Sequence, residues 1–356
     1  MMKKIILTGG GTAGHVTPNI ALLPSLRKAN FDISYIGSYK GIERNLIEEQ
    51  GITYYPISSG KLRRYFDIQN FTDPFRVLKG YGQAKQLIKK LKPDIVFSKG
   101  GFVSVPVVLA AKAKGVPVII HESDMTPGLA NKIAMRGATK ICCNFPETLA
   151  HLPQEKAVLT GSPIREELLR GNKAAALSFL GFNDEKPVLL IMGGSIGSVF
   201  INNAVRSSLD DLLKSFQIVH LCGKGNLDSA LDKSEGYRQF EYISDELPDI
   251  FAAADIVVSR AGANAICELL ALRKPNILIP LSKNASRGDQ ILNAESFEKQ
   301  GFSLVMEEES VTGTKLTDAI FDVYVNRATY KTAMEQSPTA DSVGIIMGLI
   351  EELLNP

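Results

Sequence analysis

The sequence predicts an α/β protein with two domains, each built on a parallel β-sheet with helices on both faces. The first observation is size: 356 residues, 45% hydrophobic and 22% charged, are enough for two domains with separate cores. The second is that short apolar runs alternate with stretches of helical spacing, which is typical of a covered parallel sheet. The third is that this pattern pauses near residues 160–163 and then begins again.

The first half of the chain contains six short apolar or β-branched runs that predict strands. They cover residues 4–7, 33–36, 53–57, 95–97, 116–120 and 141–142. Stretches with helical spacing, such as 21–29 and 105–113, separate most of them. We expect these elements to form a first domain over residues 1–162.

The second half repeats the alternation, with helical stretches again between the predicted strands. These strands cover residues 188–192, 218–221, 240–243, 256–259, 276–279 and 303–306. We expect a second domain over residues 163–339. The last stretch is amphipathic, and we expect this helix, at about residues 340–356, to pack back on the first domain.

Charge and composition exclude several classes of protein. Forty basic and 38 acidic residues give a net charge of +2, which is too balanced for a protein that binds nucleic acid mainly by neutralising phosphates. The apolar run after Lys4 ends at Leu7, too short for a signal peptide or a membrane span. We therefore expect a cytoplasmic chain, whose four scattered cysteines, without zinc-site spacing, are reduced core thiols.

The stretch from Gly9 to Pro18 reads as a strand end, a glycine loop and a helix start. Glycines let backbone N–H groups approach a ligand, and a helix N-terminus favours an anion, so the loop could hold a phosphate. It also fits the dinucleotide fingerprint of NAD(P) oxidoreductases. That fingerprint needs an acid at the end of the second strand, whereas Asp32 precedes the strand, so this alternative is disfavoured.

Further glycine clusters follow other predicted strands. They lie at Gly100-Gly101, at 193–197 and at Gly262. Each alone could be only a tight strand-to-helix turn. Several together would suit two substrates that each carry a diphosphate, because each such turn can present N–H donors to an anion. Glu268, in the second turn of a predicted helix, could accept hydrogen bonds from a ribose or be a solvated glutamate.

Five segments, in order along the chain, resemble glycosyltransferase family 28. They are Gly9-Gly10-Gly11-Thr12-Ala13-Gly14-His15-Val16-Thr17-Pro18, His121-Glu122-Ser123-Asp124 with the following Pro127-Gly128-Leu129-Ala130-Asn131-Lys132, Gly161-Ser162-Pro163-Ile164-Arg165, Gly193-Gly194-Ser195, and Arg260-Ala261-Gly262 through Glu268. The likeness covers nearly the whole chain. It implies a GT-B architecture of two Rossmann-like domains and the transfer of GlcNAc from UDP-GlcNAc to lipid I, the undecaprenyl-diphosphoryl-MurNAc-pentapeptide of peptidoglycan synthesis.

The resemblance also implies a set of ligand contacts. The family's UDP-GlcNAc contacts match Thr12, Ala13, Gly14, Arg165, Ser195, Ile243, Ala263, Asn264, Ala265, Ile266, Glu268 and Gln290. Ile243 would offer its backbone to uracil and Glu268 would bind the ribose. Ser195 and the helix that begins near Ala263 would hold the donor diphosphate. The acceptor diphosphate would lie on Gly10, Gly11, Gly100 and Gly101.

The expected chemistry is an inverting transfer without a metal or cofactor. The chain has no Asp-x-Asp pair to hold a metal on a nucleotide diphosphate, so helix dipoles would stabilise the leaving UDP. One base must take the proton of the acceptor hydroxyl. His15 is the first candidate, because an imidazole ordinarily titrates near neutrality, and Asp124 is the second. A purely structural histidine is the alternative.

A helical stretch that begins near residue 74 mixes apolar and basic side chains. Phe75, Val77, Leu78, Lys79 and Tyr81 fall where the family has its membrane-facing residues. Such a surface suits an anionic membrane, which would place the protein peripherally on the cytoplasmic face of the cell membrane. A core helix with a solvated basic face is the alternative.

The chain departs from the family's usual pattern at a few positions. It reads His121-Glu122-Ser123-Asp124 where the family usually reads His-Glu-Gln-Asn, and Ala13 replaces a glycine. The change to Asp124 matters most, because that position contacts the donor sugar. A related lipid-linked or diacylglycerol glycosyltransferase therefore stays open as an alternative, as does a UDP-GlcNAc 2-epimerase of the same fold.

Overall fold

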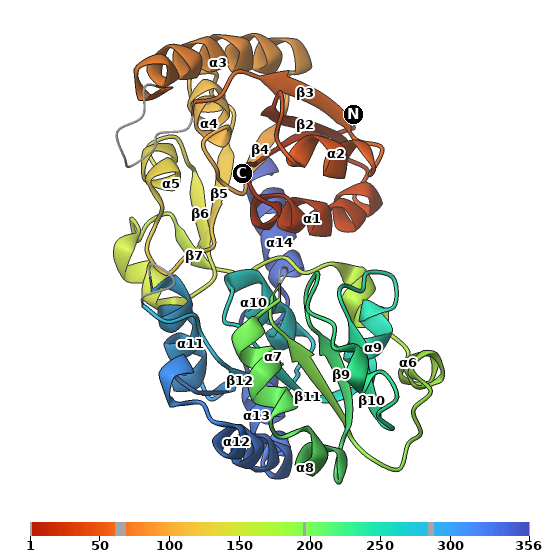
Figure 1. Ribbon diagram of the computed structural model, residues 1–356. Helices are drawn as coiled ribbons and strands as arrows, with labels where there is room; N and C mark the ends of the chain where they lie inside the picture. The colour runs from red at the N-terminus through yellow and green to blue at the C-terminus, as the bar shows by residue number, and fades with distance from the viewer. Residues whose placement is uncertain (1, 61–68, 195–196, 284–287, 356) are drawn as a thin grey trace. The chain divides into compact units, whose positions relative to one another are not determined.

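The computed structural model describes residues 2–60, 69–194, 197–283 and 288–355, except for the side chains of residues 69–74. The chain divides into two compact units (Figure 1). Unit 1 comprises Met1–Arg165 together with Asp341–Pro356, and unit 2 comprises Glu166–Ala340.

Unit 1 is built on a seven-stranded parallel sheet with the strand order β3-β2-β1-β4-β5-β6-β7. The strands are β1 Lys4–Thr8, β2 Asp32–Ser38, β3 Thr53–Ile57, β4 Ile95–Ser98, β5 Val118–Glu122, β6 Lys140–Cys143 and β7 Ala157–Leu159. The predicted strands of this half are confirmed, and β7 is an addition. The order reverses direction between β1 and β4, so the crevice at the carboxyl ends of these two strands is where ligands bind in open α/β sheets.

The helices of unit 1 cover both faces of this sheet. They are η1 Ala13–His15, α1 Thr17–Lys28, α2 Glu43–Glu48, α3 Gln69–Leu91, α4 Ser104–Lys112, α5 Leu129–Ala134, η2 Pro146–His151 and α14 Ser342–Leu354. Pro18 lies in the first turn of α1, where its missing N–H leaves no hydrogen bond unmade. The fold class expected from the alternating pattern is therefore confirmed for this half.

Alternation along β1 explains the two cores of unit 1. Ile5 and Leu7 contribute to one cluster with α1 and α14, whereas Ile6 contributes to the cluster on the other face with α3 and α4. All three side chains are at most 1% exposed. A strand apolar on both faces fits only a sheet covered on both sides, which is what the uninterrupted apolar runs predict.

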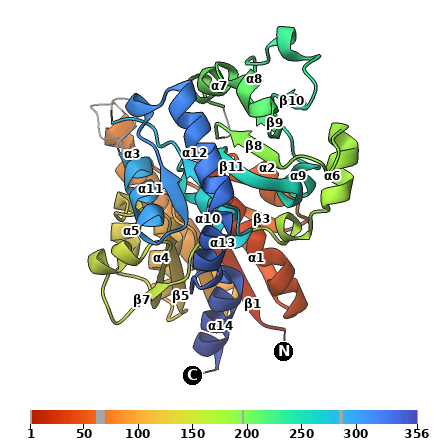
Figure 2. The same cartoon turned by 90° about the horizontal axis from the view of Figure 1, so that it is seen from below.

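The C-terminal helix belongs to unit 1. Ile346, Leu349 and Ile350 of α14 lie in the same core cluster as Leu22 and Leu26 of α1. Figures 1 and 2 show α14, drawn in dark blue, beside α1, drawn in red, although the two helices come from opposite ends of the chain.

Unit 2 repeats the design with a six-stranded parallel sheet in the order β10-β9-β8-β11-β12-β13. The strands are β8 Val188–Met192, β9 Gln217–Leu221, β10 Tyr237–Phe240, β11 Ala254–Ser259, β12 Asn276–Leu278 and β13 Ser303–Val305. The switch in strand order falls between β8 and β11, the counterparts of β1 and β4. The second α/β unit predicted from the restart of the pattern is confirmed.

The helices of unit 2 are η3 Glu166–Arg170, α6 Lys173–Leu180, α7 Val199–Arg206, α8 Leu209–Leu213, η4 Ser229–Leu231, α9 Leu247–Ala253, α10 Ala263–Ala271, α11 Asp289–Lys299, η5 Glu308–Ser310, α12 Gly313–Val325 and α13 Arg327–Glu335. One core cluster joins β8, β9, β11 and β12 to α7 and α12. Its centre includes Leu189, Ile218, Ile256 and Ile320, all fully buried.

One predicted strand is wrong in position. The apolar run 240–243 suggests a strand there, but β10 covers Tyr237–Phe240 and ends where that run begins. β10 lies at an edge of the sheet, so of its side chains only Tyr237 is fully buried, and the polar Arg238 and Gln239 follow it. An edge strand does not need an apolar run, so apolar content alone misplaces it.

No helix in the described part of the chain is both long enough and apolar enough to cross a bilayer. The four cysteines, Cys142, Cys143, Cys222 and Cys267, are all buried, in agreement with the prediction of core thiols.

Candidate active site

In unit 1, β1 and β4 end side by side, with Thr8 paired to Ser98 in register. The chain leaves β1 into the loop of Gly10 and Gly11 and leaves β4 into Gly100 and Gly101. The two loops touch, because a Cβ placed on Gly101 would lie 2.3 Å from the carbonyl oxygen of Gly10. Gly101 also has a φ of 84°, which disfavours any other residue. The structure thus brings together the four glycines that sequence analysis assigned to one diphosphate.

A buried carboxylate, that of Glu43 in α2, fixes the first loop. Its Oε2 accepts a hydrogen bond from the backbone N–H of Gly11 at 3.2 Å, and its Oε1 accepts from the N–H of Ser38 at 3.0 Å. The Glu43 side chain is fully buried. Gly10 and Gly41 leave the room for this carboxylate, because a Cβ on either residue would collide with it.

His15 ends the short helix η1 that follows this loop. Its Nδ1 lies 3.0 Å from Oγ1 of Thr12, which orients the half-buried ring. Burial lowers the pKa of His15 to about 4, and the neighbouring charge of Lys99 lowers it further, whereas Glu43 and a hydrogen bond to the Gly10 backbone act in the opposite direction. The expectation of a group that titrates near neutrality is therefore wrong: the imidazole is neutral throughout the physiological range. Ala13 and Gly14 form the rest of η1.

Behind the loops lies a buried polar cluster of Lys99, His121 and Ser123. The Lys99 ammonium donates to Nδ1 of His121 at 2.8 Å and to Oγ of Ser123. His121 Nε2 lies 2.8 Å from the carbonyl oxygen of Gly161. Burial first, and then Lys99, holds the pKa of His121 well below its ordinary value. Lys99 is 1% exposed, so its amine lies inside the domain next to the loop of Gly100 and Gly101.

Asp124, the second candidate base, is exposed and is positioned through its neighbour Glu122. The buried Glu122 carboxylate accepts from the backbone N–H of Asp124 at 2.9 Å and of Gly128 at 3.1 Å, and from the side-chain amide of Asn131 at 2.9 Å. The loop 123–128 is thus folded around one carboxylate. The loop 123–128 is connected to the glycine loops through Ser123, whose hydroxyl accepts a hydrogen bond from Lys99, the residue before Gly100.

Unit 2 has its own glycine loop at the end of β8. Gly197 has a φ of 79°, and a Cβ there would lie 2.1 Å from the carbonyl oxygen of Cys222. Ser198 caps α7 by accepting a hydrogen bond from the N–H of Ile201 at 3.3 Å. The cap is itself held by Arg260 at the end of β11, whose Nη2 donates to Ser198 Oγ at 2.7 Å. Ser195, predicted to contact the donor, lies outside the described residues.

Arg260 forms a buried ion pair with Glu308. Its Nη2 lies 2.7 Å from Oε1 of Glu308, with the two side chains 7% and 15% exposed. The other terminal nitrogen donates to the carbonyl oxygens of Ile279 at 3.1 Å and Pro280 at 3.3 Å. One guanidinium therefore links the residue after β11 to the N-cap of α7 and to the segment that follows β12.

The helix α10 follows β11 directly. Its N-cap, Gly262, has no side chain to accept from the first-turn N–H groups of Ala263, Asn264 and Ala265. Within the described part of the chain, no side chain caps this nine-residue helix, so its first-turn N–H groups and its positive dipole end could receive an anion. Ile266 is buried beneath it, and Glu268 is half-buried one turn further along.

The remaining predicted donor contacts lie on loops. Ile243 is 6% exposed, and no hydrogen bond joins its backbone to any residue in the described part of the chain. Gln290 uses Oε1 to accept a hydrogen bond from the backbone N–H of Leu281, in the loop after β12, at 3.1 Å. Arg165 is the last residue of the first segment of unit 1, and its Nε is buried without a hydrogen-bond partner among the described residues.

The proposed membrane face lies on α3. Phe75 is 75% exposed and Leu78 is 67% exposed, and one helical turn separates them. Lys79 is also exposed. Val77 is only half-exposed, and Tyr81 packs against the core cluster beneath the helix, so these two residues contribute less to the surface.

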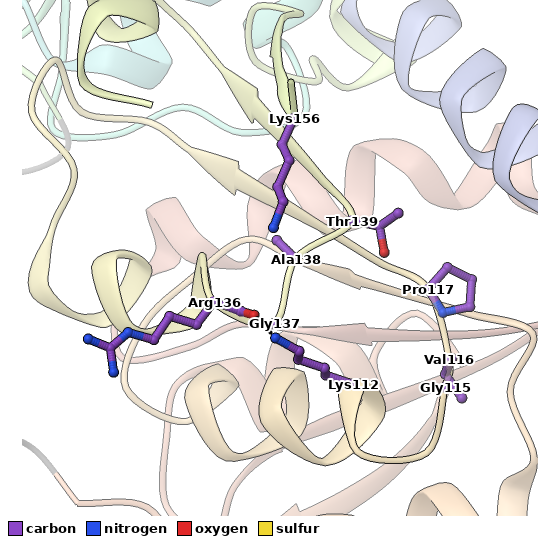
Figure 3. Close-up of a pocket in the computed structure, with 9 residues that line it drawn as sticks. All are labelled: Lys112, Gly115, Val116, Pro117, Arg136, Gly137, Ala138, Thr139 and Lys156. Atoms are coloured by element: carbon purple, nitrogen blue, oxygen red, sulfur yellow. Dashed lines mark hydrogen bonds between the residues drawn. The ribbon is translucent and has the colours of Figure 1, made fainter. Parts of the chain in front are cut away.

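A cavity of about 330 Å³ lies at the amino ends of the unit 1 strands, where β5 and β6 begin (Figure 3). Lys112, Arg136 and Lys156 surround it, and Figure 3 shows the Lys156 side chain reaching towards Ala138. The glycine loops follow the carboxyl ends of the strands, so this cavity is separate from the candidate active site.

The sequence analysis gave no role to Glu43 or Lys99, and named Arg260 only within a motif. The sequence does contain a signal for Lys99 and Glu43, since both lie close to glycine segments. Lys99 directly precedes Gly100-Gly101, and Gly41 precedes Glu43 in a second short glycine segment. Nothing in the sequence indicates that their charges are buried, because the elements that cover them come from distant parts of the chain.

Comparison with known proteins places this geometry in a family. The model for the glycosyltransferase family 28 N-terminal domain matches residues 5–143, and that for the glycosyltransferase family 28 C-terminal domain matches residues 188–346. Two curated relatives bear the name "UDP-N-acetylglucosamine--N-acetylmuramyl-(pentapeptide) pyrophosphoryl-undecaprenol N-acetylglucosamine transferase". The protein of Lachnospira eligens is 66% identical and that of Lachnoclostridium phytofermentans is 64% identical, each over 99% of both chains.

A solved structure shows the same architecture. The crystal structure of Acinetobacter baumannii MurG superposes with a TM-score of 0.75 at 26% identity, over 98% of this chain and 99% of that one. The GT-B fold expected from the resemblance is confirmed. The chain belongs to glycosyltransferase family 28.

Proposed function

We propose that the chain transfers GlcNAc from UDP-GlcNAc to the C4 hydroxyl of MurNAc in undecaprenyl-diphosphoryl-MurNAc-pentapeptide, with inversion at the sugar's C1. The observation that carries this proposal is the full-length likeness to transferases of that name at 66% and 64% identity. The geometry of the two crevices is compatible with it, because each unit ends its central strands in glycine loops suited to a diphosphate.

Unit 2 is the proposed donor domain, corresponding to the expected residues 163–339. The first-turn N–H groups of α10 would donate hydrogen bonds to the diphosphate of UDP and stabilise the negative charge that develops as UDP leaves. Glu268 would accept hydrogen bonds from the ribose hydroxyls. The buried Ile243, whose backbone forms no hydrogen bond with the described residues, would offer its N–H and C=O to the edge of uracil.

Unit 1 is the proposed acceptor domain, corresponding to the expected residues 1–162 and the helix at 340–356. The paired glycine loops would hold the acceptor diphosphate. The neutral imidazole of His15 would take the proton of the C4 hydroxyl while its oxygen attacks C1 of GlcNAc. The bond from C1 to the UDP oxygen breaks, and UDP departs with that electron pair.

The direct test is incubation with radiolabelled UDP-GlcNAc, with and without the lipid acceptor. Label in lipid only when the undecaprenyl-diphosphoryl-MurNAc-pentapeptide is present supports the proposal. Label transferred to diacylglycerol or to another lipid carrier instead would favour the related glycosyltransferases, which the departure at Asp124 leaves open. Conversion to UDP-ManNAc without acceptor would indicate a 2-epimerase.

We also propose that the protein binds peripherally to the cytoplasmic face of the cell membrane through α3. Phe75 and Leu78 are exposed on this helix beside Lys79, and Lys85 lies further along it. The apolar side chains would insert at the acyl boundary, and the cations would bind anionic headgroups. Each such cation contributes about 1 kcal/mol to the free energy of membrane binding.

Sedimentation with anionic vesicles tests the membrane proposal. The variant Lys79→Glu/Lys85→Glu should lose binding, whereas Lys224→Glu/Lys299→Glu, the same change of charge at exposed positions of unit 2, should retain it. Equal binding of both variants would exclude α3 as the membrane face.

A further inference from the structure

We propose that His220 is a positioning residue for donor binding: acting through Asn202, its imidazole fixes the carbonyl group of Cys222, against which Gly197 of the unit 2 glycine loop packs. This inference rests on the proposed function, in which unit 2 binds the diphosphate of UDP. It goes further by assigning a role to a histidine that is 0% exposed and therefore touches neither substrate.

The hydrogen bonds of His220 have only one possible direction. Its Nδ1 lies 2.9 Å from the hydroxyl of Tyr237, and its Nε2 lies 2.9 Å from Oδ1 of Asn202. The side-chain nitrogen of Asn202 donates to the carbonyl oxygen of Cys222 at 2.9 Å. Because a carbonyl oxygen can only accept, Asn202 turns its own oxygen towards His220, so Nε2 carries the ring proton and Nδ1 accepts from Tyr237.

This chain of hydrogen bonds is sealed from water. Tyr237, His220 and Asn202 are at most 2% exposed. Burial, and then the charge of Arg206, lower the pKa of His220 to about 3, so the ring is neutral across the physiological range and keeps the same tautomer. A buried polar group that loses its partner has no water to replace it. Each member of the chain therefore depends on the next.

The chain ends at the glycine loop. The carbonyl group of Cys222 touches Gly197, since a Cβ placed on Gly197 would lie 2.1 Å from its oxygen. Asn202 also donates its backbone N–H to the carbonyl oxygen of Ser198 at 2.9 Å. One asparagine thus holds both Cys222 and Ser198, the residue that follows the loop and caps α7. Arg260, from the end of β11, holds the same serine through its Oγ.

A second amide reaches the same carbonyl group but does not replace this link. The side-chain nitrogen of Asn226 lies 3.3 Å from the Cys222 oxygen and comes from the loop after β9, in the same segment of chain. Asn202 comes from α7 and so connects β9 to the helix that follows the glycine loop. The loops after β8 and β11 would bind one diphosphate together, so their relative position sets the affinity for UDP.

The test compares two amides at position 220. In His220→Gln the side-chain nitrogen reaches about as far from the backbone as Nε2 of histidine, so it can still donate to Asn202. In His220→Asn the side chain is one methylene shorter and cannot reach it. Both variants remove the imidazole and bury an amide. By calorimetry, we expect a Kd for UDP near the wild-type value in His220→Gln and one about tenfold higher in His220→Asn, the cost of about one unmade hydrogen bond.

A second variant breaks the next link of the chain. Asn202→Leu keeps about the volume of the side chain and removes the donor to Cys222, so the Kd for UDP should rise by a similar factor. It also carries the test if His220→Asn does not fold.

Two controls separate positioning from stability. Tyr237→Phe removes the hydroxyl at the far end of the chain and leaves the links from His220 to Cys222, so its Kd for UDP should stay near the wild-type value. Met334→Ala opens a cavity at a fully buried position of α13, which contributes to neither loop. It should lower the free energy of unfolding without changing the Kd.

Hydrogen exchange provides a readout without any ligand. The backbone N–H of Asn202 should exchange faster in His220→Asn than in His220→Gln, relative to the N–H of Val257 in β11, which donates within the sheet. Equal exchange in the two variants would contradict a positioning role for His220.

Equal Kd values for the two amide variants would overturn the inference, and so would an equal rise in Tyr237→Phe or Met334→Ala. Absence of UDP binding by the wild type would instead overturn the proposed function. Hydrogen exchange would in that case still decide whether His220 fixes the start of α7, so the two failures are distinguishable.

Discussion

The two units share a topology and differ in what lies behind their glycine loops. In both, the strand order reverses between two central strands, β1 and β4 in unit 1 and β8 and β11 in unit 2, and each central strand ends in a glycine loop. Behind the loops of unit 1 lie the buried side chains of Glu43, Lys99 and His121, which form hydrogen bonds with the loops and with one another. Behind those of unit 2 lies the buried ion pair of Arg260 and Glu308.

This difference teaches that one local motif can serve two kinds of chemistry. Unit 1 surrounds an imidazole with buried charges of both signs, which tune whether it accepts a proton. Unit 2 offers the N-terminus of α10, whose N-cap glycine makes no side-chain cap hydrogen bond, beside the buried ion pair of Arg260 and Glu308. A proton acceptor and a leaving diphosphate need these two different environments.

The largest expected effect is a fall in turnover, which tests whether a residue of unit 1, His15, is the general base. His15→Ala should lower kcat by about 10²- to 10⁴-fold, the usual contribution of a general base, while the affinity for UDP-GlcNAc measured by calorimetry stays unchanged. The control is His151→Ala, which removes an exposed histidine of the same unit. A near-normal rate in His15→Ala would remove this residue from the mechanism.

The next effect concerns the rigidity of unit 2. Glu308→Gln leaves Arg260 as a buried charge without its carboxylate, so the free energy of unfolding should fall by about 3 kcal/mol. Urea unfolding measures the change, and the affinity for UDP should fall with it. Asp184→Asn is the matched control: it breaks the exposed pair with Lys173, for which a loss below about 1 kcal/mol is expected. Equal losses of unfolding free energy in the two variants would show that the buried ion pair stabilises unit 2 no more than the exposed one.

A smaller effect separates binding from chemistry within unit 2. Glu268→Gln should raise the KM for UDP-GlcNAc about tenfold with little change in kcat, because a hydrogen bond to a charged group contributes about 1.5 kcal/mol. Steady-state kinetics measure both constants, and Glu295→Gln on the exposed surface of α11 provides the control. A fall in kcat with constant KM would instead give Glu268 a role in the transition state.

The smallest expected effect is that kcat/KM changes little with pH. A base must be unprotonated to act, and the pKa of His15 is lowered to about 4, so kcat/KM should stay constant from pH 8 down to about 5 and fall only as the pH approaches 4. Initial rates across this range measure the profile. A fall centred near 6.5, the ordinary value for histidine, would mean that the imidazole is not tuned by its surroundings.

Part of the site could be predicted from the sequence because its residues act through the backbone. The glycines at 10, 11, 100 and 101 follow apolar strands, and parallel strands of one sheet end at the same edge, so their proximity follows from the pattern. The role of Gln290 could not be decided, since its partner Leu281 depends on the path of a loop. The strand at 240–243 was misplaced because an edge strand has no need of an apolar run.

The sequence by itself determined the two α/β units, the strand ends that carry the loops and the family to which the chain belongs, because periodicity and motif order are local properties. Only the tertiary structure decided which charges are buried. Glu43 meets Gly11 across 32 positions of sequence, Lys99 meets His121 across 22, and Arg260 meets Glu308 across 48. Burial and pairing depend on every element packed around a group, so the neutral state of His15 is a property of the folded domain and not of its motif.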